Sequence, residues 1–314
     1  RRDGETGLRV GDDMNPAELL TNHTYRMMLL GTVIIGFTTG AIGTFAYLRK
    51  RTLLADVVSH SSIGGVMLAF IIAASFGIDG RSNWVLILGS AAISLLAVQL
   101  VDWLPRVSVT KVDAAMAIVL ALFFGGGMVL HRVILAGPYP SKGGLAEYLF
   151  GNASHLTVED IVSSIVVAGA TFLLAAIAFK ELKLSCFDPE YAATLGFSSR
   201  LLSMLLNAVV VLSIVIGLKA VGLVLMVALA IAPPIAARQW TTRVGSMLLL
   251  SGLIGAVSAV IGSWLAVSIG RVPTGPMIVL VVTVFAFVSI LFAPKRSILL
   301  VALARHRHRK EVTA

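Results

Sequence analysis

Long apolar stretches alternate with short polar or basic turns along almost the whole chain. A helix that crosses a bilayer needs roughly 20 mostly apolar residues. Nine stretches meet or approach this requirement: 27–48, 57–77, 84–101, 114–136, 159–179, 201–218, 220–237, 244–269 and 276–293. Only Lys219 separates 201–218 from 220–237, so this region is either two full spans or one span with a re-entrant segment. The pattern predicts an all-α fold, a polytopic helical bundle in a membrane.

Composition argues against a soluble protein. Hydrophobic residues make up 57% of the chain and charged residues only 13%, whereas soluble domains carry about 25% charged residues. Lipid is a favourable solvent for the apolar surface that such a chain must expose. The net charge of +9 resides largely in turns between apolar stretches, so we expect membrane lipid and no nucleic acid as a partner. The single cysteine, Cys186, excludes an internal disulfide and a cysteine-based metal cluster.

The distribution of lysine and arginine predicts the orientation. With the N-terminus outside, 16 of the 25 basic residues fall on the inner side and five in outer loops. The positive-inside rule therefore favours an outer N-terminus and a cytoplasmic C-terminus in a bacterial cell (inner) membrane. The predicted organisation is an extracytoplasmic segment over 1–26, a transmembrane domain over 27–294 and a basic cytoplasmic tail over 295–314. The polar residues 1–13 carry no fold prediction.

Asp56 and His60 are the first candidates for chemistry. They lie four residues apart at the start of the second span, so they project from one helix face. Both are costly in lipid and should face the bundle interior or a water-filled cavity. A carboxylate with an imidazole suits Mn²⁺, Fe²⁺ or Zn²⁺, and Ser59, Ser61 and Ser62 could add weak oxygen contacts. The alternative is a hydrogen-bonded pair that anchors the helix end.

Other features are weaker candidates. Pro233 and Pro234 remove backbone donors and are expected to break the helix, either as a simple kink or as part of a pathway. His23, His131 and His155 each stand alone, and a lone histidine is usually a satisfied polar residue. His306 and His308 belong to the basic tail and are expected to face solvent or lipid headgroups.

The absence of several sequence motifs narrows the function. The chain has no G-x-x-x-x-G-K-[ST], no H-E-x-x-H and no G-x-S-x-G, so it has no P-loop and none of these hydrolase signatures. Two alternatives stay open on the residues alone. One is an intramembrane enzyme that uses Asp56 and His60 as an acid–base pair. The other is a secondary metal-ion transporter, which needs charges inside the membrane for ion coupling.

Several segments together resemble the manganese/zinc/iron permease family of ABC importers. They are LRKRTLLADVVSHSSIGGVMLAF (48–70), GLAEYLFGNASHLTVEDI (144–161), FDPEYAATLGF (187–197), VGLVLMVALAIAPPIAARQWTTR (221–243) and VPTGPMIVL (272–280). The resemblance covers roughly residues 15–296. The segments 111–130 and 228–240 look most like the manganese- and iron-type branch.

The resemblance implies a type II importer bundle that transports a divalent metal, manganese first and then iron or zinc. It implies no catalytic residue and no permanently bound cofactor, since partner ATPase subunits would hydrolyse ATP. The other implied partners are a second permease subunit, identical or different, and an extracytoplasmic metal-binding protein facing the loop 137–158. Asp56 and His60 fall on the family's metal-pathway positions. Glu190, Ala192 and Gly196 match the spacing of the E-A-A-x-x-x-G motif that couples permeases to the ATPase, with Tyr191 in place of the first alanine.

Overall fold

The chain forms a bundle of helices in a computed structural model that describes residues 22–80, 82–139, 143–145, 147–153, 156–269 and 272–293. No strand occurs within these ranges. The helices are α2 (His23–Leu48), α3 (Leu53–Ser75), α4 (Asn83–Val107), α5 (Val112–Ala136), α6 (Glu147–Phe150), α7 (Val158–Ile177), α8 (Phe179–Phe187), α9 (Pro189–Thr194), α10 (Ser199–Val215), α11 (Leu218–Val221), α12 (Leu223–Trp240), α13 (Val244–Ile269) and α14 (Thr274–Phe292). The predicted all-α membrane bundle is confirmed.

The number of full-length spans differs from the prediction of nine. Seven of the described helices are long and apolar enough to cross a membrane: α2, α3, α4, α5, α7, α13 and α14. The stretches 201–218 and 220–237 become α10 and α12, two shorter apolar helices joined by the four-residue α11. The interruption around Lys219 is therefore a short helix between two longer ones.

The prediction that Pro233 and Pro234 break their helix is wrong. Both prolines lie inside α12, which runs without interruption from Leu223 to Trp240. The chain instead breaks at Gly222, whose φ of 85° belongs to the left-handed region that glycine adopts easily. Similarly, α4 continues beyond the predicted residue 101, through Pro105, to Val107.

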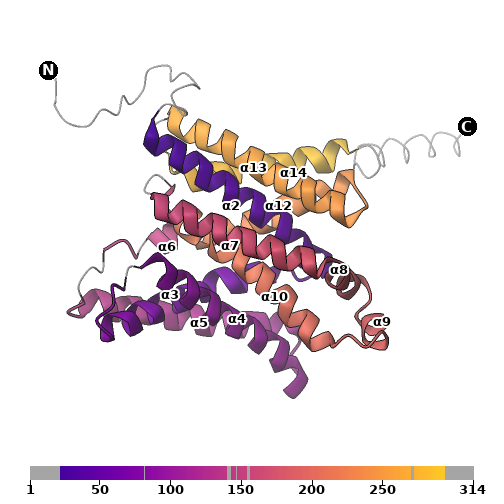
Figure 1. The fold of residues 1–314 in the computed structure, drawn as a ribbon. Coiled ribbons are helices and arrows are strands. Elements are labelled where there is room, and N and C mark those ends of the chain that lie inside the picture. The colour runs from indigo at the N-terminus through magenta and orange to yellow at the C-terminus, as the bar shows by residue number, and fades with distance from the viewer. Residues whose placement is uncertain are drawn as a thin grey trace, which may run out of the picture.

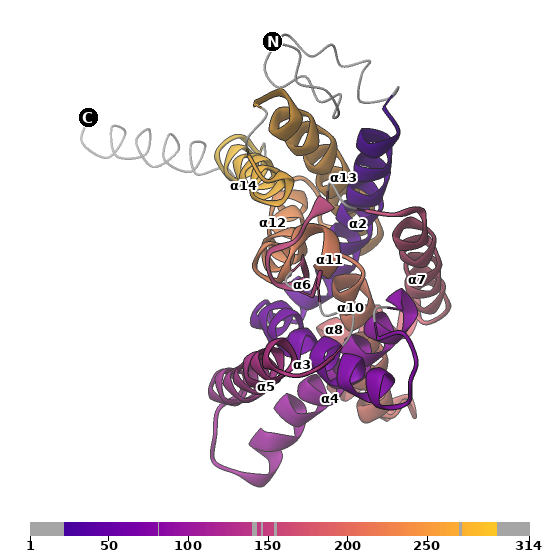
Figure 2. The ribbon, with the colours of Figure 1, turned by 90° about the vertical axis from the view of Figure 1, so that its left-hand side faces the viewer.

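Two groups of helices make up the bundle (Figures 1 and 2). In one group α2 packs along α13, with α12 and α14 beside them, and in the other α3 lies against α4 and α5. Helices α7 and α10 lie between the groups in Figure 1. Small residues bring backbones close together: a Cβ on Gly36 of α2 would meet the Gly255 carbonyl oxygen of α13 at 2.7 Å. Such contacts are typical of helix pairs in lipid.

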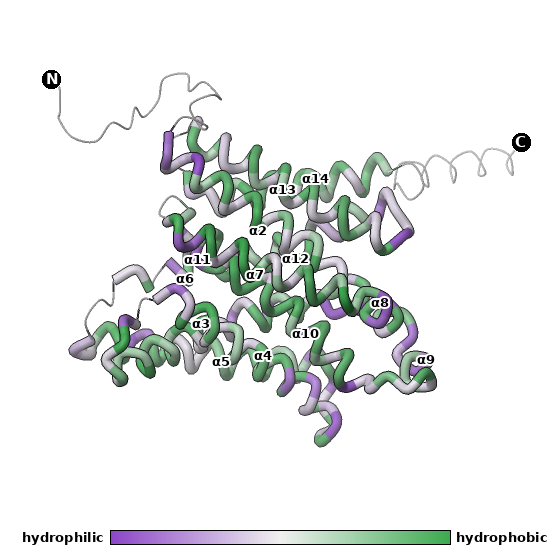
Figure 3. The backbone as a smooth tube through the Cα atoms, viewed as in Figure 1, coloured by the Kyte–Doolittle hydropathy of each residue, from purple (hydrophilic) through white to green (hydrophobic). Residues whose placement is uncertain are grey.

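Hydropathy follows the predicted membrane pattern. The middles of the long helices are apolar, and hydrophilic positions gather toward the ends of the bundle (Figure 3). Large apolar side chains on the outside, such as Leu88, Leu122 and Leu173, are more than half exposed, as lipid contact requires. The bundle has two distinct ends, with α6 at one and α8 and α9 at the other (Figure 1).

Several sequence-level candidates fall outside the described residues. They are His155 of the outer loop, the N-terminal segment before residue 22 and the basic tail with His306 and His308.

Candidate functional site

Asp56 and His60 lie together near the start of α3, as the sequence predicted. Asp56 occupies the first turn of this helix, which begins at Leu53 after the basic turn between α2 and α3. One helical turn separates the two residues, and His60 Nε2 lies 3.2 Å from Asp56 Oδ1. The Asp56 side chain is 35% exposed and that of His60 19%, so the pair is open on one side and buried on the other.

Asp56 and His60 contact each other directly, which is the geometry that the alternative of a hydrogen-bonded pair also requires. The Nδ1 atom of His60, in contrast, is buried without a hydrogen-bond partner. A buried polar atom without a partner costs free energy. The imidazole therefore retains an unsatisfied nitrogen in this conformation.

Helix α5 fixes the orientation of the His60 ring. The ring packs edge-on against Phe124, with centroids 4.7 Å apart and planes at 84°. The backbones of α3 and α5 come close together at two glycines. A Cβ added to Gly127 of α5 would lie only 2.7 Å from the amide nitrogen of Gly64 on α3. Gly64 and Gly127 thus allow α3 and α5 to pack closely, whereas Gly125 faces open space.

The neighbouring serines take different roles. Ser61 and Ser62 donate to the Val58 carbonyl oxygen of their own helix, at 3.2 and 2.7 Å, and Ser62 also meets the Ser94 hydroxyl at 2.7 Å. The Ser62 hydroxyl therefore links α3 to α4, whereas the Ser61 hydroxyl is engaged within its own helix. The hydroxyl oxygen of Ser59 is buried without a hydrogen-bond partner, so Ser59 alone of the three keeps an unengaged oxygen.

The Asp56–His60 pair has the spacing that two ligands of one ion require. Bonds of about 2.0–2.2 Å from a first-row ion to oxygen and nitrogen place neighbouring ligands about 3 Å apart. The observed separation is 3.2 Å. No cluster of three or more His, Cys, Asp or Glu side chains suited to a metal occurs among the described residues. The described part of this chain thus offers two candidate ligands at this place and no third.

The segment 187–197, which resembles the coupling segment of the permease family, contains the short helix α9. Asp188 caps α9 by accepting a hydrogen bond from the Tyr191 amide at 2.9 Å, and Pro189 starts the helix. Glu190 is exposed in the first turn, and Ala192 is buried against the bundle with 1% exposure. Gly196, with φ of 87°, turns the chain out of the helix.

Apolar side chains surround this short helix on the outside. Phe187, Tyr191, Leu195 and Phe197 are 40–58% exposed at this end of the bundle. An exposed apolar group beside polar residues is typical of a protein interface. The sequence contained a signal for it, because these apolar residues interrupt a segment that is otherwise polar.

Two polar networks in the structure were not predicted from the sequence. Asp102 on α4 pairs with Arg51 and accepts a hydrogen bond from the Asn207 amide of α10 at 3.0 Å. Asp160 on α7 pairs with Lys219 of α11. The partners lie 51 to 105 residues apart in sequence, so no local spacing could reveal them.

Fold and site together define a polytopic helical membrane protein with a close Asp–His pair on the largely buried α3 and a short helix, α9, at one end. Residues 22–293 match the ABC 3 transport family, and the chain belongs to that family. This membership supports an ABC transporter subunit and gives no support to the intramembrane enzyme or the secondary transporter.

Similar proteins cover nearly the whole chain. The zinc transport system membrane protein TroC of Treponema pallidum is 36% identical over 92% of this chain and 95% of its own length. The manganese transport system membrane protein MntC of Bacillus subtilis is 37% identical over 91% of this chain and 65% of its own length. The PsaBC structure from Streptococcus pneumoniae, in complex with Fab, matches with a TM-score of 0.79 and 30% identity, covering 91% of this chain and 98% of that one.

Proposed function

We propose that this chain is the permease subunit of an ATP-driven importer for a divalent transition metal, with manganese ahead of iron and zinc. Membership of the ABC 3 transport family and the similarity to proteins named as manganese and zinc transport components support this reading. The carrying observation is the Asp56–His60 pair, an oxygen and a nitrogen ligand 3.2 Å apart inside the bundle. This donor set suits first-row divalent ions in general.

Two ligands are an advantage for a transport pathway. Conduction requires binding that is favourable enough for the ion to enter and weak enough for it to leave. Asp56 supplies the negative charge, and His60 supplies a neutral nitrogen once the contact between them opens around the ion. We propose that water or the second permease subunit completes the coordination on the exposed side of the pair.

We propose that the partner ATPase docks at α9. The exposed Glu190, the buried Ala192 and the turn at Gly196 support a rigid short helix that projects from the end of the bundle. The exposed apolar side chains beside it supply contact area for a partner. In this proposal the chain itself hydrolyses no ATP and holds no permanent cofactor.

We propose further that the N-terminus is extracytoplasmic and that α8 and α9 lie at the cytoplasmic end. The basic residues Arg49, Lys50 and Arg51 end α2 at the same end of the bundle, as the positive-inside rule favours. The opposite end, with α6, would then meet the metal-delivering binding protein.

Uptake of radioactive manganese into vesicles containing the permease, its ATPase and the binding protein tests the function. We expect Asp56→Ala and His60→Ala each to abolish most ATP-dependent uptake while assembly persists. Asp113→Ala and His131→Ala are matched controls, since these residues lie elsewhere on α5, and they should transport normally. Wild-type rates for manganese, iron and zinc in both Asp56→Ala and His60→Ala would make the pair structural.

A further inference from the structure

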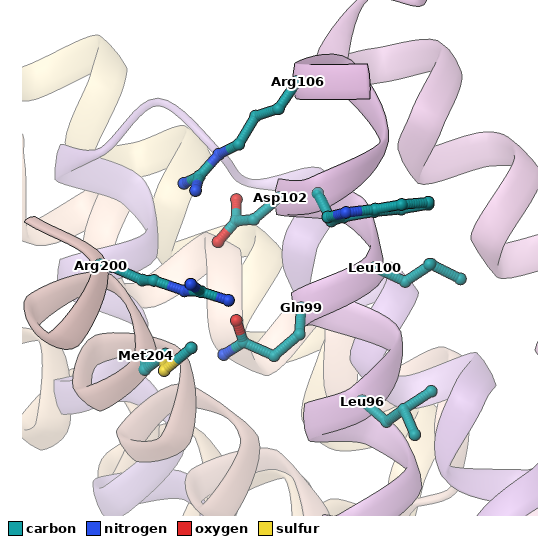
Figure 4. A pocket seen from close by; sticks show the side chains of 8 residues that line it. Leu96, Gln99, Leu100, Asp102, Arg106, Arg200 and Met204 are labelled. Atoms are coloured by element: carbon teal, nitrogen blue, oxygen red, sulfur yellow. The ribbon is translucent and has the colours of Figure 1, made fainter. Parts of the chain in front are cut away.

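A cavity of about 300 Å³ opens between the last turns of α4 and the first turns of α10. Two helices line it with both polar and apolar side chains. They are Leu96, Gln99, Leu100, Asp102, Trp103 and Arg106 from α4, and Arg200 and Met204 from α10. The side chains of Arg106 and Arg200 both point toward Asp102 from their separate helices (Figure 4). The cavity therefore brings arginines from two elements to one polar centre.

The polar part of the cavity carries an excess of positive charge. Both carboxylate oxygens of Asp102 are already engaged, one by Arg51 and the other by the Asn207 amide at 3.0 Å. Within the described ranges, Arg106 and Arg200 make no ion pair, and both are exposed. One carboxylate is thus surrounded by three guanidinium groups, and two of them remain available to an anion.

The other part of the cavity is apolar and faces outward. Leu96, Leu100 and Trp103 recur at helical spacing on α4, so they form one stripe that runs from the arginines toward the middle of the helix. Leu96 and Trp103 are 53% and 52% exposed. Tryptophan is enriched where the hydrocarbon of a bilayer meets its headgroups. The stripe therefore places the arginines at headgroup level and the leucine beside acyl chains.

We propose that this cavity binds the headgroup phosphate of an anionic phospholipid, with an acyl chain along Leu96 and Trp103. Guanidinium groups match phosphate oxygens through paired, charge-assisted hydrogen bonds. Basic pockets between membrane helices on the cytoplasmic side suit anionic lipids. In the proposed orientation this is the cytoplasmic leaflet. A soluble anion would use only the arginines and leave the apolar stripe without a role.

The site also adjoins the segment proposed to dock the ATPase. Arg200 is the second residue of α10, which follows α9 after a short link. A bound phosphate joining Arg106 to Arg200 would hold the start of α10 against the end of α4. The lipid would thereby fix the base from which α9 projects.

Native mass spectrometry of the detergent-purified chain tests the proposal. Wild-type protein should retain phosphatidylglycerol in preference to phosphatidylcholine. The double variant Arg106→Gln/Arg200→Gln should weaken phosphatidylglycerol retention by at least about tenfold, because each arginine near anionic lipid contributes appreciably. The matched control Lys111→Gln/Arg243→Gln removes the same charge from exposed positions outside the cavity and should retain the lipid.

Three further arms make the result decisive. Arg106→Lys/Arg200→Lys keeps the charge and should retain part of the preference, which guards against loss of fold as the cause. Inorganic phosphate should not displace the lipid at millimolar concentration, and displacement would overturn the proposal in favour of a free-anion site. Unchanged lipid retention in Arg106→Gln/Arg200→Gln, together with lost ATPase association, would also overturn it and make the cavity a contact for the ATPase.

Discussion

The ammonium nitrogen of Lys219 lies 2.8 Å from both carboxylate oxygens of Asp160. This bidentate pair joins α11, between the two shorter helices, to the first turn of α7. The Asp160 side chain is 5% exposed, and it also accepts hydrogen bonds from the amide and hydroxyl of Thr157 at 2.9 Å. The Lys219 carbonyl oxygen in turn accepts from the Asn152 amide at 2.9 Å. One residue therefore ties α11 to two other segments.

Removal of either partner should destabilise the protein. A buried charge left without its partner costs about 3–5 kcal/mol, and a pair open on one side should lie at the lower end. We expect Asp160→Asn and Lys219→Met each to lower the Tm of the detergent-purified protein, and the double variant to lose less than the sum of the two. Glu159→Gln, an exposed carboxylate in the same turn, should leave the Tm unchanged. Additive losses in the double variant would show that the two groups are not coupled.

A conservative change at Asp56 separates a ligand from a structural anchor. Asp56→Glu keeps the carboxylate but moves it by about one methylene, so it should bind the ion with altered geometry. We expect uptake between that of wild type and that of Asp56→Ala, and an increased KM for manganese. Concentration dependence of initial uptake rates measures both quantities. Asp56→Asn is the control, because it keeps the size and hydrogen bonding but removes the charge. If Asp56→Asn transports better than Asp56→Glu, charge at this position is not what the ion requires.

The sequence predicts most of the fold because each membrane-spanning helix can be recognised from its own apolar stretch. An apolar stretch of sufficient length has no other stable place than lipid or a large core, so α2, α3, α5, α7, α13 and α14 lie close to their predicted bounds. The short helix α9 carries signals of the same local kind, with Pro189 at its start and Gly196 after its end. Asp56 and His60 were found because four-residue spacing places them on one face.

The errors arise where tertiary contacts override a local rule. Pro233 and Pro234 predicted a break, yet α12 packs along α2, α13 and α14 and stays continuous. The break at Gly222 could not be predicted from the sequence, since a glycine in an apolar stretch is compatible with a helix. The Asp160–Lys219 pair joins residues 59 positions apart, and only the packing of α7 against the region of α11 brings them together.

The segment around α9 should control association with the ATPase. Glu190→Lys reverses a charge in the first helical turn, where a carboxylate favours the helix dipole. Gly196→Pro forces a φ near −65° on a position at 87° and should distort the turn. We expect both variants to insert into the membrane but to lose most uptake and ATPase co-purification. Asp113→Lys, a charge reversal at an exposed position on α5, is the control. Normal transport in Glu190→Lys and Gly196→Pro would remove this segment from the coupling mechanism.

Cys186 should react slowly with maleimide for a reason unrelated to membrane sidedness. Burial raises the pKa of this thiol from 9.0 to about 11, and Arg49 opposes the shift without cancelling it. The reactive species is the thiolate, so a rise from 9 to about 11 lowers its fraction at pH 8 roughly a hundredfold. We expect labelling of the folded protein to accelerate as pH rises from 8 to 10, whereas denatured protein should label rapidly already at pH 8. Equal rates for folded and denatured protein at pH 8 would contradict the burial of this thiol.

Because Cys186 is a slow reporter, the orientation is better tested with exposed positions in a Cys186→Ser background. Val109, in the turn between α4 and α5, is fully exposed, and Ile78, beyond the end of α3, is 56% exposed. They follow helices that run in opposite directions, so they lie at opposite ends of the bundle. With the N-terminus outside, a membrane-impermeant maleimide should label Ile78→Cys in intact cells and Val109→Cys only in inverted vesicles. The reverse pattern would place α9 outside the cell, where no ATPase could reach it.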